Sequence, residues 1–217
     1  MSRWPHDDPA SLAAFYGNPD RDEPGSRLVP VTPPFQMYYD GKPVEHIMFH
    51  EKAAPALKEA LEAIWEYYGK DQARIDALRI SRYSGSYNRR RIAGSTKWSN
   101  HAYGAAIDLD AEHNGFNTGH GTMPKAVVDC FKSTGALWGG DYRGRTDPMH
   151  FEYCSRGVEV SVEKPKPAAQ PAVPPLVPPP KPIPAPVVAK ASPVAAKPKP
   201  SPDEVVDKAL RDLEPKK

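Results

Sequence analysis

The longest regular pattern of apolar and polar residues predicts an amphipathic α-helix from Glu51 to Tyr68. Apolar side chains recur there at the three- and four-residue spacing that puts them on one helix face: Leu57, Leu61, Ile64, Trp65 and Tyr68. Gly69 follows directly, as glycine commonly does where a helix ends. A second, shorter helix is predicted from Met123 to Ser133, closing near Gly135, with three residues directed inward: Ala126, Val127 and Cys130.

A spacing of two residues predicts strands elsewhere. Residues 106–110 (AIDLD) alternate apolar and acidic side chains, which indicates a half-buried strand with Asp108 and Asp110 on one face. Residues 150–153 (HFEY) alternate in the same way, and residues 80–83 are expected to form a short strand. These elements together predict an α+β domain in which helices pack on an antiparallel sheet.

Composition divides the chain into a folded part and a tail. Sixteen of the 27 prolines lie after residue 162, and residues 164–200 contain no acidic side chain and no glycine. Such a segment buries too little apolar surface to offset the entropy lost on ordering. We therefore predict a folded domain at 1–162, a disordered Pro/Ala/Lys-rich linker at 163–200, and a short amphipathic helix or frayed tail at 201–217.

Charge and hydropathy limit the partners and the compartment. The net charge is +2, and no run of 18 apolar residues suggests a transmembrane helix. The N-terminal segment MSRWPHDDPASL lacks the apolar core of a secretory signal, so we expect synthesis in the cytoplasm. We expect a monomer with no nucleic-acid partner, and at most weak contact of the basic tail with an anionic envelope. Cys130 and Cys154 are expected to be buried free thiols.

Two histidines and two aspartates provide the candidate chemistry. His101 and Asp108 lie in SNHAYGAAIDLD, and Asp147 and His150 lie in DPMHFEY. A catalytic zinc takes three protein ligands from His and Asp/Glu, which suits His101, Asp108 and His150, and keeps one position for water. Asp147 is a spare acid that could hold the attacking water. Singly, such residues are more often surface histidines, loop aspartates or turn residues.

Four segments, in the same order, resemble motifs of one family. SNHAYGAAID resembles the SxHxxGxAxD motif of zinc peptidases that cut peptidoglycan peptides, and DPMHFEY resembles their [ED]xxH element. Residues 138–141 (WGGD) and 87–94 (YNRRRIAG) are similar to two further segments, the second ending in R-x-I-x-G. The family includes VanY-like D-Ala-D-Ala carboxypeptidases and the L-Ala-D-Glu endopeptidases of phage lysins. The resemblance spans roughly residues 30–155.

The resemblance implies a hedgehog/D-Ala-D-Ala peptidase-like fold with one zinc per chain, bound by three residues: His101, Asp108 and His150. It makes Asp147 the catalytic base and Arg90 the cation that faces the oxyanion. Three consecutive arginines, at 89–91, leave the register of this cation open by one residue. The same motifs suggest three contacts with substrate: Ser99, Tyr87 and Trp138.

Three classes of function remain open on the sequence. The first is a zinc peptidase acting on peptidoglycan stem peptides, either a lysin-type L-Ala-D-Glu endopeptidase or a D-Ala-D-Ala carboxypeptidase. The absence of a signal favours the lysin type, since phage lysins are released from the cytoplasm to the wall. The second is a non-catalytic zinc-containing relative, and the third is a cell-wall-binding protein that acts through its basic tail. The paired Asp147 and Arg90 favour the first class.

Overall fold

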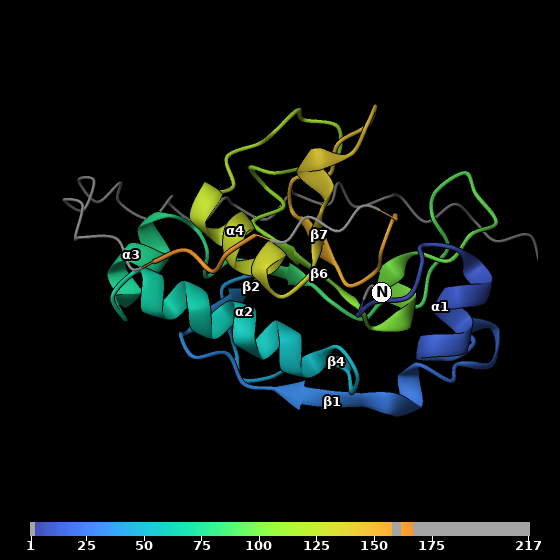
Figure 1. Ribbon diagram of the computed structural model, residues 1–217. Helices are drawn as coiled ribbons and strands as arrows, with labels where there is room; N and C mark the ends of the chain where they lie inside the picture. Colours follow the sequence, from blue (N-terminus) through green and yellow to red (C-terminus); the bar gives the residue numbers. More distant parts are fainter. Residues whose placement is uncertain (1–2, 158–161, 167–217) are drawn as a thin grey trace, which may run out of the picture. The chain divides into compact units, whose positions relative to one another are not determined.

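The computed structural model describes residues 3–157 and 162–166, which contain four α-helices and three small antiparallel sheets (Figure 1). The helices are α1 (Pro9–Tyr16), α2 (Ala54–Tyr67), α3 (Gln72–Ala77) and α4 (Lys125–Ser133). All strand pairs in these sheets are antiparallel. The predicted α+β class is therefore confirmed for this part of the chain.

The two predicted helices are both present and pack side by side, α2 against α4 (Figure 1). Helix α2 begins at Ala54, three residues later than predicted, with a proline in its first turn as helix starts allow. It ends at Tyr67, one residue before the predicted end, and Gly69 follows with a left-handed φ of 72° and an N–H that donates to the Glu66 carbonyl at 3.0 Å. In α4 the buried residues are Val127, Val128, Cys130 and Phe131. The predicted inward residue Ala126 is only partly buried.

The largest sheet has the strand order β5–β6–β8–β7. Its strands are β5 (Tyr83–Gly85), β6 (Ala106–Leu109), β7 (Leu137–Trp138) and β8 (His150–Glu152). Strands β6 and β8 lie in register with Ile107 opposite Phe151 and Asp108 opposite His150. Phe151 stacks on Phe131 of α4 with ring centroids 4.0 Å apart, so α4 covers this face of the sheet. The other face is free to carry polar chemistry.

Two strand predictions need correction. Strand β6 ends at Leu109, and Asp110 follows with a left-handed φ of 45° and an ion pair to Arg79 at 3.0 Å. Asp108 and Asp110 therefore do not share a strand face. The strand expected at 80–83 begins only at Tyr83, because a turn centred on Arg79, with φ 60°, occupies the preceding residues.

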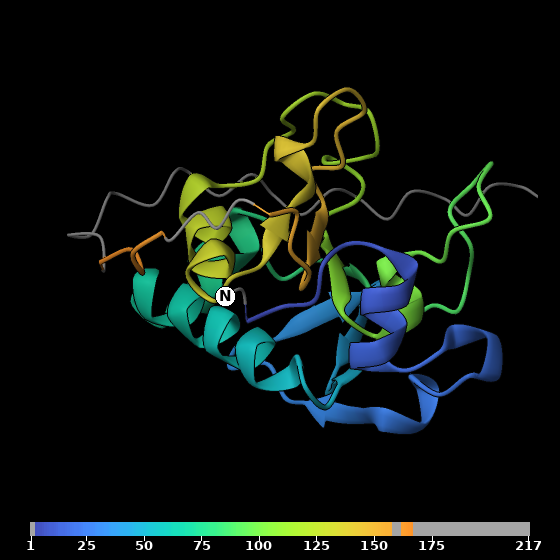
Figure 2. The ribbon, with the colours of Figure 1, turned by 45° about the vertical axis from the view of Figure 1, so that its right-hand side comes forward.

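The two-stranded sheets were not predicted. Strand β1 (Leu28–Val31) pairs with β4 (Ile47–His50) and lies against α2, while β2 (Met37–Tyr39) pairs with β3 (Lys42–Val44) (Figures 1 and 2). The β2–β3 turn is Asp40-Gly41, with φ values of 48° and 73°. Positive φ at both central residues is the type I′ geometry that suits the twist of a hairpin.

The predicted tail lies almost wholly outside the described residues. This applies to the linker at 163–200, apart from residues 163–166, and to the helix expected at 201–217. In the described part of the chain, no helix has both the length and the apolar character needed to cross a membrane. Cys130 and Cys154 are both buried and unbonded, as predicted.

Candidate metal and catalytic site

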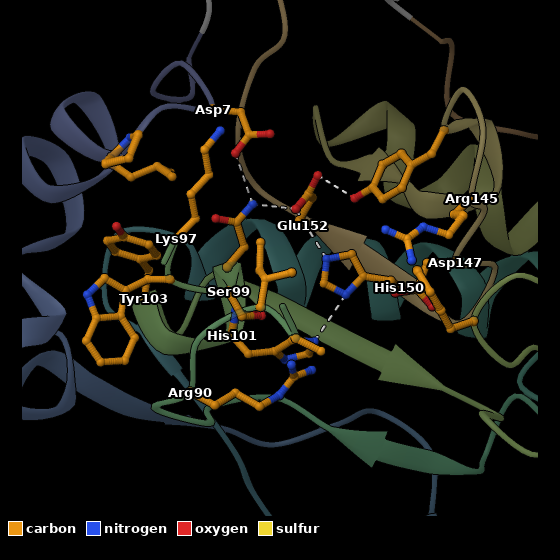
Figure 3. Close-up of a pocket in the computed structure, with 18 of the residues that line it drawn as sticks. Asp7, Arg90, Lys97, Ser99, His101, Tyr103, Arg145, Asp147, His150 and Glu152 are labelled. Carbon is orange, nitrogen blue, oxygen red and sulfur yellow. Dashed lines mark hydrogen bonds and ion pairs between the residues drawn. The ribbon is translucent and has the colours of Figure 1, made fainter. Parts of the chain in front are cut away.

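The four-stranded sheet and the turn next to it bring the three candidate ligands together, and Figure 3 shows two of them, His101 and His150. Asp108 of β6 and His150 of β8 are directly opposed across the strand pair. His101 lies on a 3-10 turn, Asn100–Tyr103, that leads into β6. Ser99 begins this turn, and its hydroxyl accepts a hydrogen bond from the His101 backbone N–H at 3.4 Å. The spacing of His101 and Asp108 in the sequence is therefore a turn followed by a strand.

Gly104 closes that turn for two reasons. Its φ is 64°, and a β-carbon there would lie 2.6 Å from Leu28 Cδ2 and 3.2 Å from the His50 backbone nitrogen. Only glycine combines this backbone conformation with so close an approach of another segment. The glycine of the SxHxxGxAxD motif thus fixes the direction in which the chain passes from His101 to Asp108.

The three candidate ligands form a triangle of the size that a zinc ion needs, in which each oxygen of Asp108 faces one histidine. His101 Nε2 lies 3.1 Å from His150 Nδ1 and 3.1 Å from Asp108 Oδ2, and His150 Nδ1 lies 2.9 Å from Asp108 Oδ1. Tetrahedral zinc with bonds of about 2.0–2.1 Å separates its ligand atoms by about 3.3 Å. The three residues, which also form one of the potential metal-binding groups, therefore fit zinc with shifts of a few tenths of an ångström.

The remaining nitrogen of each histidine is held by a partner outside the triangle. His101 Nδ1 lies 2.5 Å from the Ser86 carbonyl oxygen, and His150 Nε2 lies 3.2 Å from Glu152 Oε2. Each of these ring nitrogens donates, because its partner can only accept. This arrangement orients both rings and is typical of metal-binding histidines.

Glu152 is a member of the site that the sequence analysis did not identify. Its side chain is buried, and besides His150 it accepts from Tyr142 at 2.5 Å, from Arg156 at 2.7 Å and from the Asn100 amide. The strand pattern already puts Glu152 and His150 two residues apart on one face. Its other partners depend on the tertiary fold.

The electrostatics of the cluster favour charged carboxylates. Burial would raise the pKa of Asp108, but hydrogen bonds from His101 and His150 hold it well below its usual range. Burial would likewise raise the pKa of Glu152, but His150 and Arg156 keep it low. His150 lies between these carboxylates, and although burial opposes its charge, the two hydrogen bonds raise its pKa to about 10. The cluster is thus built to hold positive charge at the position of His150 Nδ1.

Asp147 lies beside the triangle with a free carboxylate oxygen. Its Oδ1 is buried and has no hydrogen-bond partner among the described residues. Burial raises the pKa of Asp147, and the nearby Asp108 adds to the rise while His150 opposes it. A raised pKa brings the carboxylate nearer to the working pH, where a general base is most effective. Figure 3 shows Asp147 next to His150 in the same cavity.

The WGGD segment holds the turn that carries Asp147. The Asp147 N–H donates to the Gly139 carbonyl at 2.9 Å, and the Trp138 indole N–H donates to the Pro148 carbonyl at 2.8 Å. A β-carbon on Gly139 would lie 2.3 Å from the Asp147 carbonyl oxygen. The glycine therefore permits direct backbone packing between the two motifs, and Trp138 supports the turn from outside the cavity.

The three arginines at 89–91 face different ways. Arg89 and Arg91 bind residues near the N-terminus. Arg89 donates to the Pro19 carbonyl at 2.7 Å, and Arg91 pairs with Asp20 at 2.7 Å. Both guanidinium groups also lie over the Trp98 ring. Arg90 extends instead toward His101 (Figure 3). Among the described residues no carboxylate pairs with it. The alternation along the chain thus places Arg90 at the site.

Two cavities border the candidate ligands. The larger, of about 420 Å³, contains Asp147, His150 and the buried Ser99 in its wall. The smaller, of about 290 Å³, includes Tyr87, whose hydroxyl donates to Asp22 at 2.6 Å. Arg90 and His101 line both. Of the residues that the resemblance suggested for substrate contact, Ser99 and Tyr87 therefore border cavities and Trp138 does not.

The larger cavity also contains two cations that the sequence analysis did not identify. Lys97 and Arg145 lie on opposite sides of the His150–Glu152 pair in Figure 3. Neither forms an ion pair with a carboxylate within the described residues, and Arg145 rests over the Phe116 ring at 5.5 Å. Their place could not be inferred from sequence spacing, since each comes from a loop.

Comparison with known families supports the motif assignment. Residues 93–153 match the family described as D-alanyl-D-alanine carboxypeptidase. The matched segment contains all three candidate ligands and Asp147, and Arg90 lies just before it. The match confirms the resemblance to this peptidase family over residues 93–153. Neither the curated proteins nor the solved structures gave a match.

Proposed function

We propose that this protein is a zinc metallopeptidase that hydrolyses peptide bonds of the peptidoglycan stem, as a lysin-type L-Ala-D-Glu endopeptidase. One observation carries the zinc peptidase assignment. His101 and His150 of the ligand triangle line the same cavity as Asp147, whose buried oxygen lacks a partner among the described residues. Ligands alone would suit a structural metal, but a free carboxylate beside them suits hydrolysis.

The residues divide the chemistry between them. Zinc, when bound at the triangle, would act as a Lewis acid and lower the pKa of water. Asp147 would accept the proton of the attacking water and return it to the leaving amine. Arg90 would provide fixed positive charge to the developing oxyanion, in a place where charge stabilisation is effective. Ser99 would keep the His101 turn in place through its hydrogen bond to the backbone.

The paired cavities favour an endopeptidase. An enzyme that cuts inside a peptide must accommodate chain on both sides of the reacting carbonyl. Arg90 and His101 line both cavities, while His150 lines the larger and Asp108 the smaller, so each cavity borders the proposed reacting centre. A carboxypeptidase needs space for the peptide on one side of the reacting carbonyl only, and on the other side it needs a closed end that binds the free terminal carboxylate.

A D-Ala-D-Ala carboxypeptidase is the second candidate. The description of the matching family favours it. Lys97 and Arg145 in the larger cavity would supply the cations for a terminal carboxylate. The same two cations would serve an endopeptidase equally well, because the stem peptide carries further carboxylates beyond the L-Ala-D-Glu bond.

Digestion of purified peptidoglycan, with the new termini identified by mass spectrometry, distinguishes the endopeptidase from the carboxypeptidase. An endopeptidase exposes a new glutamate amino group, and a carboxypeptidase releases free D-alanine. A chelator and His150→Ala should each abolish hydrolysis, and metal analysis should find one zinc per chain. His113→Ala is the control, because His113 pairs with Asp110 at 2.9 Å and borders neither cavity. Hydrolysis that persists with chelator, or metal-replete protein without zinc, would refute the proposal.

The domain limits and the site of action are part of the proposal. A domain at 1–162 would hydrolyse soluble stem peptides without the segments at 163–200 and 201–217. Action on the cell wall fits the family match, and we propose in addition that the protein acts as a monomer released like a phage lysin. A chain ending at Val162 tests the limits, since loss of activity on soluble peptide would show that later residues belong to the domain.

A further inference from the structure

The smaller cavity has a lining unlike the larger one. Three tyrosines border it: Tyr39, Tyr83 and Tyr87. Serine hydroxyls and the exposed Asn88 supply most of the other polar groups, and Arg90 is its one cation among the described residues. At about 290 Å³ it has the size of a small-ligand site. We call it the tyrosine cavity.

Tyr39 is placed at its wall by the β2–β3 hairpin. The ring is 54% exposed and meets Tyr83 edge-on, with centroids 6.0 Å apart. The Tyr83 hydroxyl donates to Ser86, but the Tyr39 hydroxyl and the Asn88 amide have no hydrogen-bond partner among the described residues. Both groups are exposed, so the Tyr39 ring face and the two polar groups are accessible together to a ligand that has apolar and polar surface.

The strand below the tyrosines is shaped to leave room. The β5–β6 pairing shifts register between Tyr83 and Gly85, as at a β-bulge, and Gly85 has a φ of 143°. A β-carbon at Gly85 would meet no atom within 4 Å. Bulges often lie next to active sites, where they redirect a strand. This one turns the backbone beside Asp108 into part of the cavity wall.

We propose that the tyrosine cavity binds a saccharide ring, specifically an N-acetylated amino sugar of the glycan to which the stem peptide is attached. Such a ring presents apolar C–H faces to an aromatic side chain and hydroxyl and amide groups to the polar wall. Tyr39 would pack on the ring face, while Asn88 and the Tyr39 hydroxyl would form hydrogen bonds. This inference rests on the proposed function, because it takes the substrate to be peptidoglycan.

The charged side chains that line the two cavities indicate which end of the substrate would enter each cavity. The acidic part of the stem peptide needs cations. Arg90 lines both cavities, whereas Lys97 and Arg145, which have no carboxylate partner among the described residues, line only the larger one. Both cavities contain carboxylates, but within the described lining the tyrosine cavity has no lysine and no arginine besides Arg90. The sugar end would therefore enter the tyrosine cavity and the acidic end the larger one. The L-alanine next to the sugar then lies near His101 and Arg90, the two residues that line both cavities.

Binding of the disaccharide N-acetylglucosaminyl-N-acetylmuramic acid, with no peptide attached, tests the inference without any hydrolysis. The full-length protein should show saturation-transfer NMR signals and a dissociation constant that rises about 2- to 10-fold in Tyr39→Ala. Tyr39→Phe should keep most of the binding, because the ring remains. Tyr38→Ala is the matched control, since Tyr38 is the adjacent exposed residue of the same hairpin and does not border the cavity.

A kinetic comparison gives the second measurement. The ratio of kcat/KM for a muramyl-peptide to that for the same peptide without sugar should exceed one, and should fall in Tyr39→Ala but not in Tyr38→Ala. Protein that cleaves neither substrate contradicts the proposed function, and disaccharide binding then still decides the present inference. Absence of disaccharide binding, or binding that Tyr39→Ala leaves unchanged, overturns the saccharide site even if both peptides are cleaved.

Discussion

His150 donates from Nε2 to Glu152 Oε2 over 3.2 Å, two residues further along strand β8. The bond turns Nδ1 of the same ring toward Asp108, 2.9 Å away across the strand pair. Without it the ring would be free to rotate or to take the other tautomer. Glu152 is thus a positioning residue for the proposed zinc ligand, and it touches no reacting group itself.

Glu152→Gln should therefore weaken zinc binding by about 10- to 100-fold, the range for loss of a partner that orients a ligand histidine. Competition with a fluorescent chelator measures the affinity. Circular dichroism must show that the variant is folded, because Arg156 loses one of its two carboxylate partners and keeps only Asp7. Tyr142→Phe serves as the control, since Tyr142 contacts the other oxygen of Glu152. Equal zinc affinities in wild type and Glu152→Gln would contradict the positioning role.

Asp147→Asn should keep the zinc and lower kcat by about 10²- to 10⁴-fold, as expected when a general base is lost. The change preserves shape and removes only the basic oxygen. Zinc content by mass spectrometry and turnover of a soluble stem peptide are measured together. Asp141→Asn is the matched control, because Asp141 belongs to the adjoining segment and pairs with Lys132 outside the cavity. Near wild-type turnover in Asp147→Asn would require another base.

Arg90→Ala should lower kcat by about 10²- to 10³-fold, the loss typical of one donor to an oxyanion. Arg89→Ala and Arg91→Ala should leave kcat nearly unchanged and lower the free energy of unfolding instead, because these side chains bind Pro19 and Asp20 and cover Trp98. A large loss of kcat in either control, with none in Arg90→Ala, would move the register by one residue.

The sequence identified the long helix α2 because 14 residues give enough turns for an apolar stripe to be visible. Helices α1 and α3, with eight and six residues, are too short for such a stripe. Local signals for them do exist. Asp8 and Asp71 each accept from a backbone N–H of the first turn, as N-cap residues do. The Asp40-Gly41 hairpin turn could have been recognised in the same way.

For the site, motif spacing was enough to predict the ligands but not the residues that position them. His101, Asp108 and His150 were nominated from a turn and two strands, and the structure brings them together. The separation of Arg90 from Arg89 was not predictable, because it depends on Trp98 and on residues 19–22, far away in the sequence. Long-range contacts of this kind leave no periodic signal.

Gly139→Ala should reduce both stability and turnover. The new β-carbon would lie 2.3 Å from the Asp147 carbonyl oxygen and 2.9 Å from its β-carbon, so the turn that carries the proposed base must move. Overpacking of this kind costs about 1–3 kcal/mol. Denaturant unfolding and peptide turnover measure the two effects. Gly115→Ala is the control, since its nearest neighbour would be 3.5 Å away. Unchanged turnover in Gly139→Ala would show that Asp147 tolerates displacement.

His50 should make the stability of the domain depend on pH. The ring is fully buried, its Nε2 donates to the Tyr16 carbonyl at 2.9 Å, and its Nδ1 accepts from the Lys52 N–H at 3.2 Å, so it must stay neutral to keep both bonds. Burial lowers the pKa of His50, against a partial rise from the Tyr16 carbonyl.

Between the unfolded pKa of about 6.5 and this lower folded value, the unfolded chain binds one proton more than the folded chain. The free energy of unfolding should therefore fall as the pH falls through this window, by at most about 1.4 kcal/mol per pH unit, and this group should contribute no slope above about pH 7. Urea unfolding at intervals from pH 8 to pH 5, on wild type and His50→Gln, isolates the effect. The advantage of wild type over the variant should shrink toward low pH. Parallel curves would show that His50 titrates normally in the folded protein.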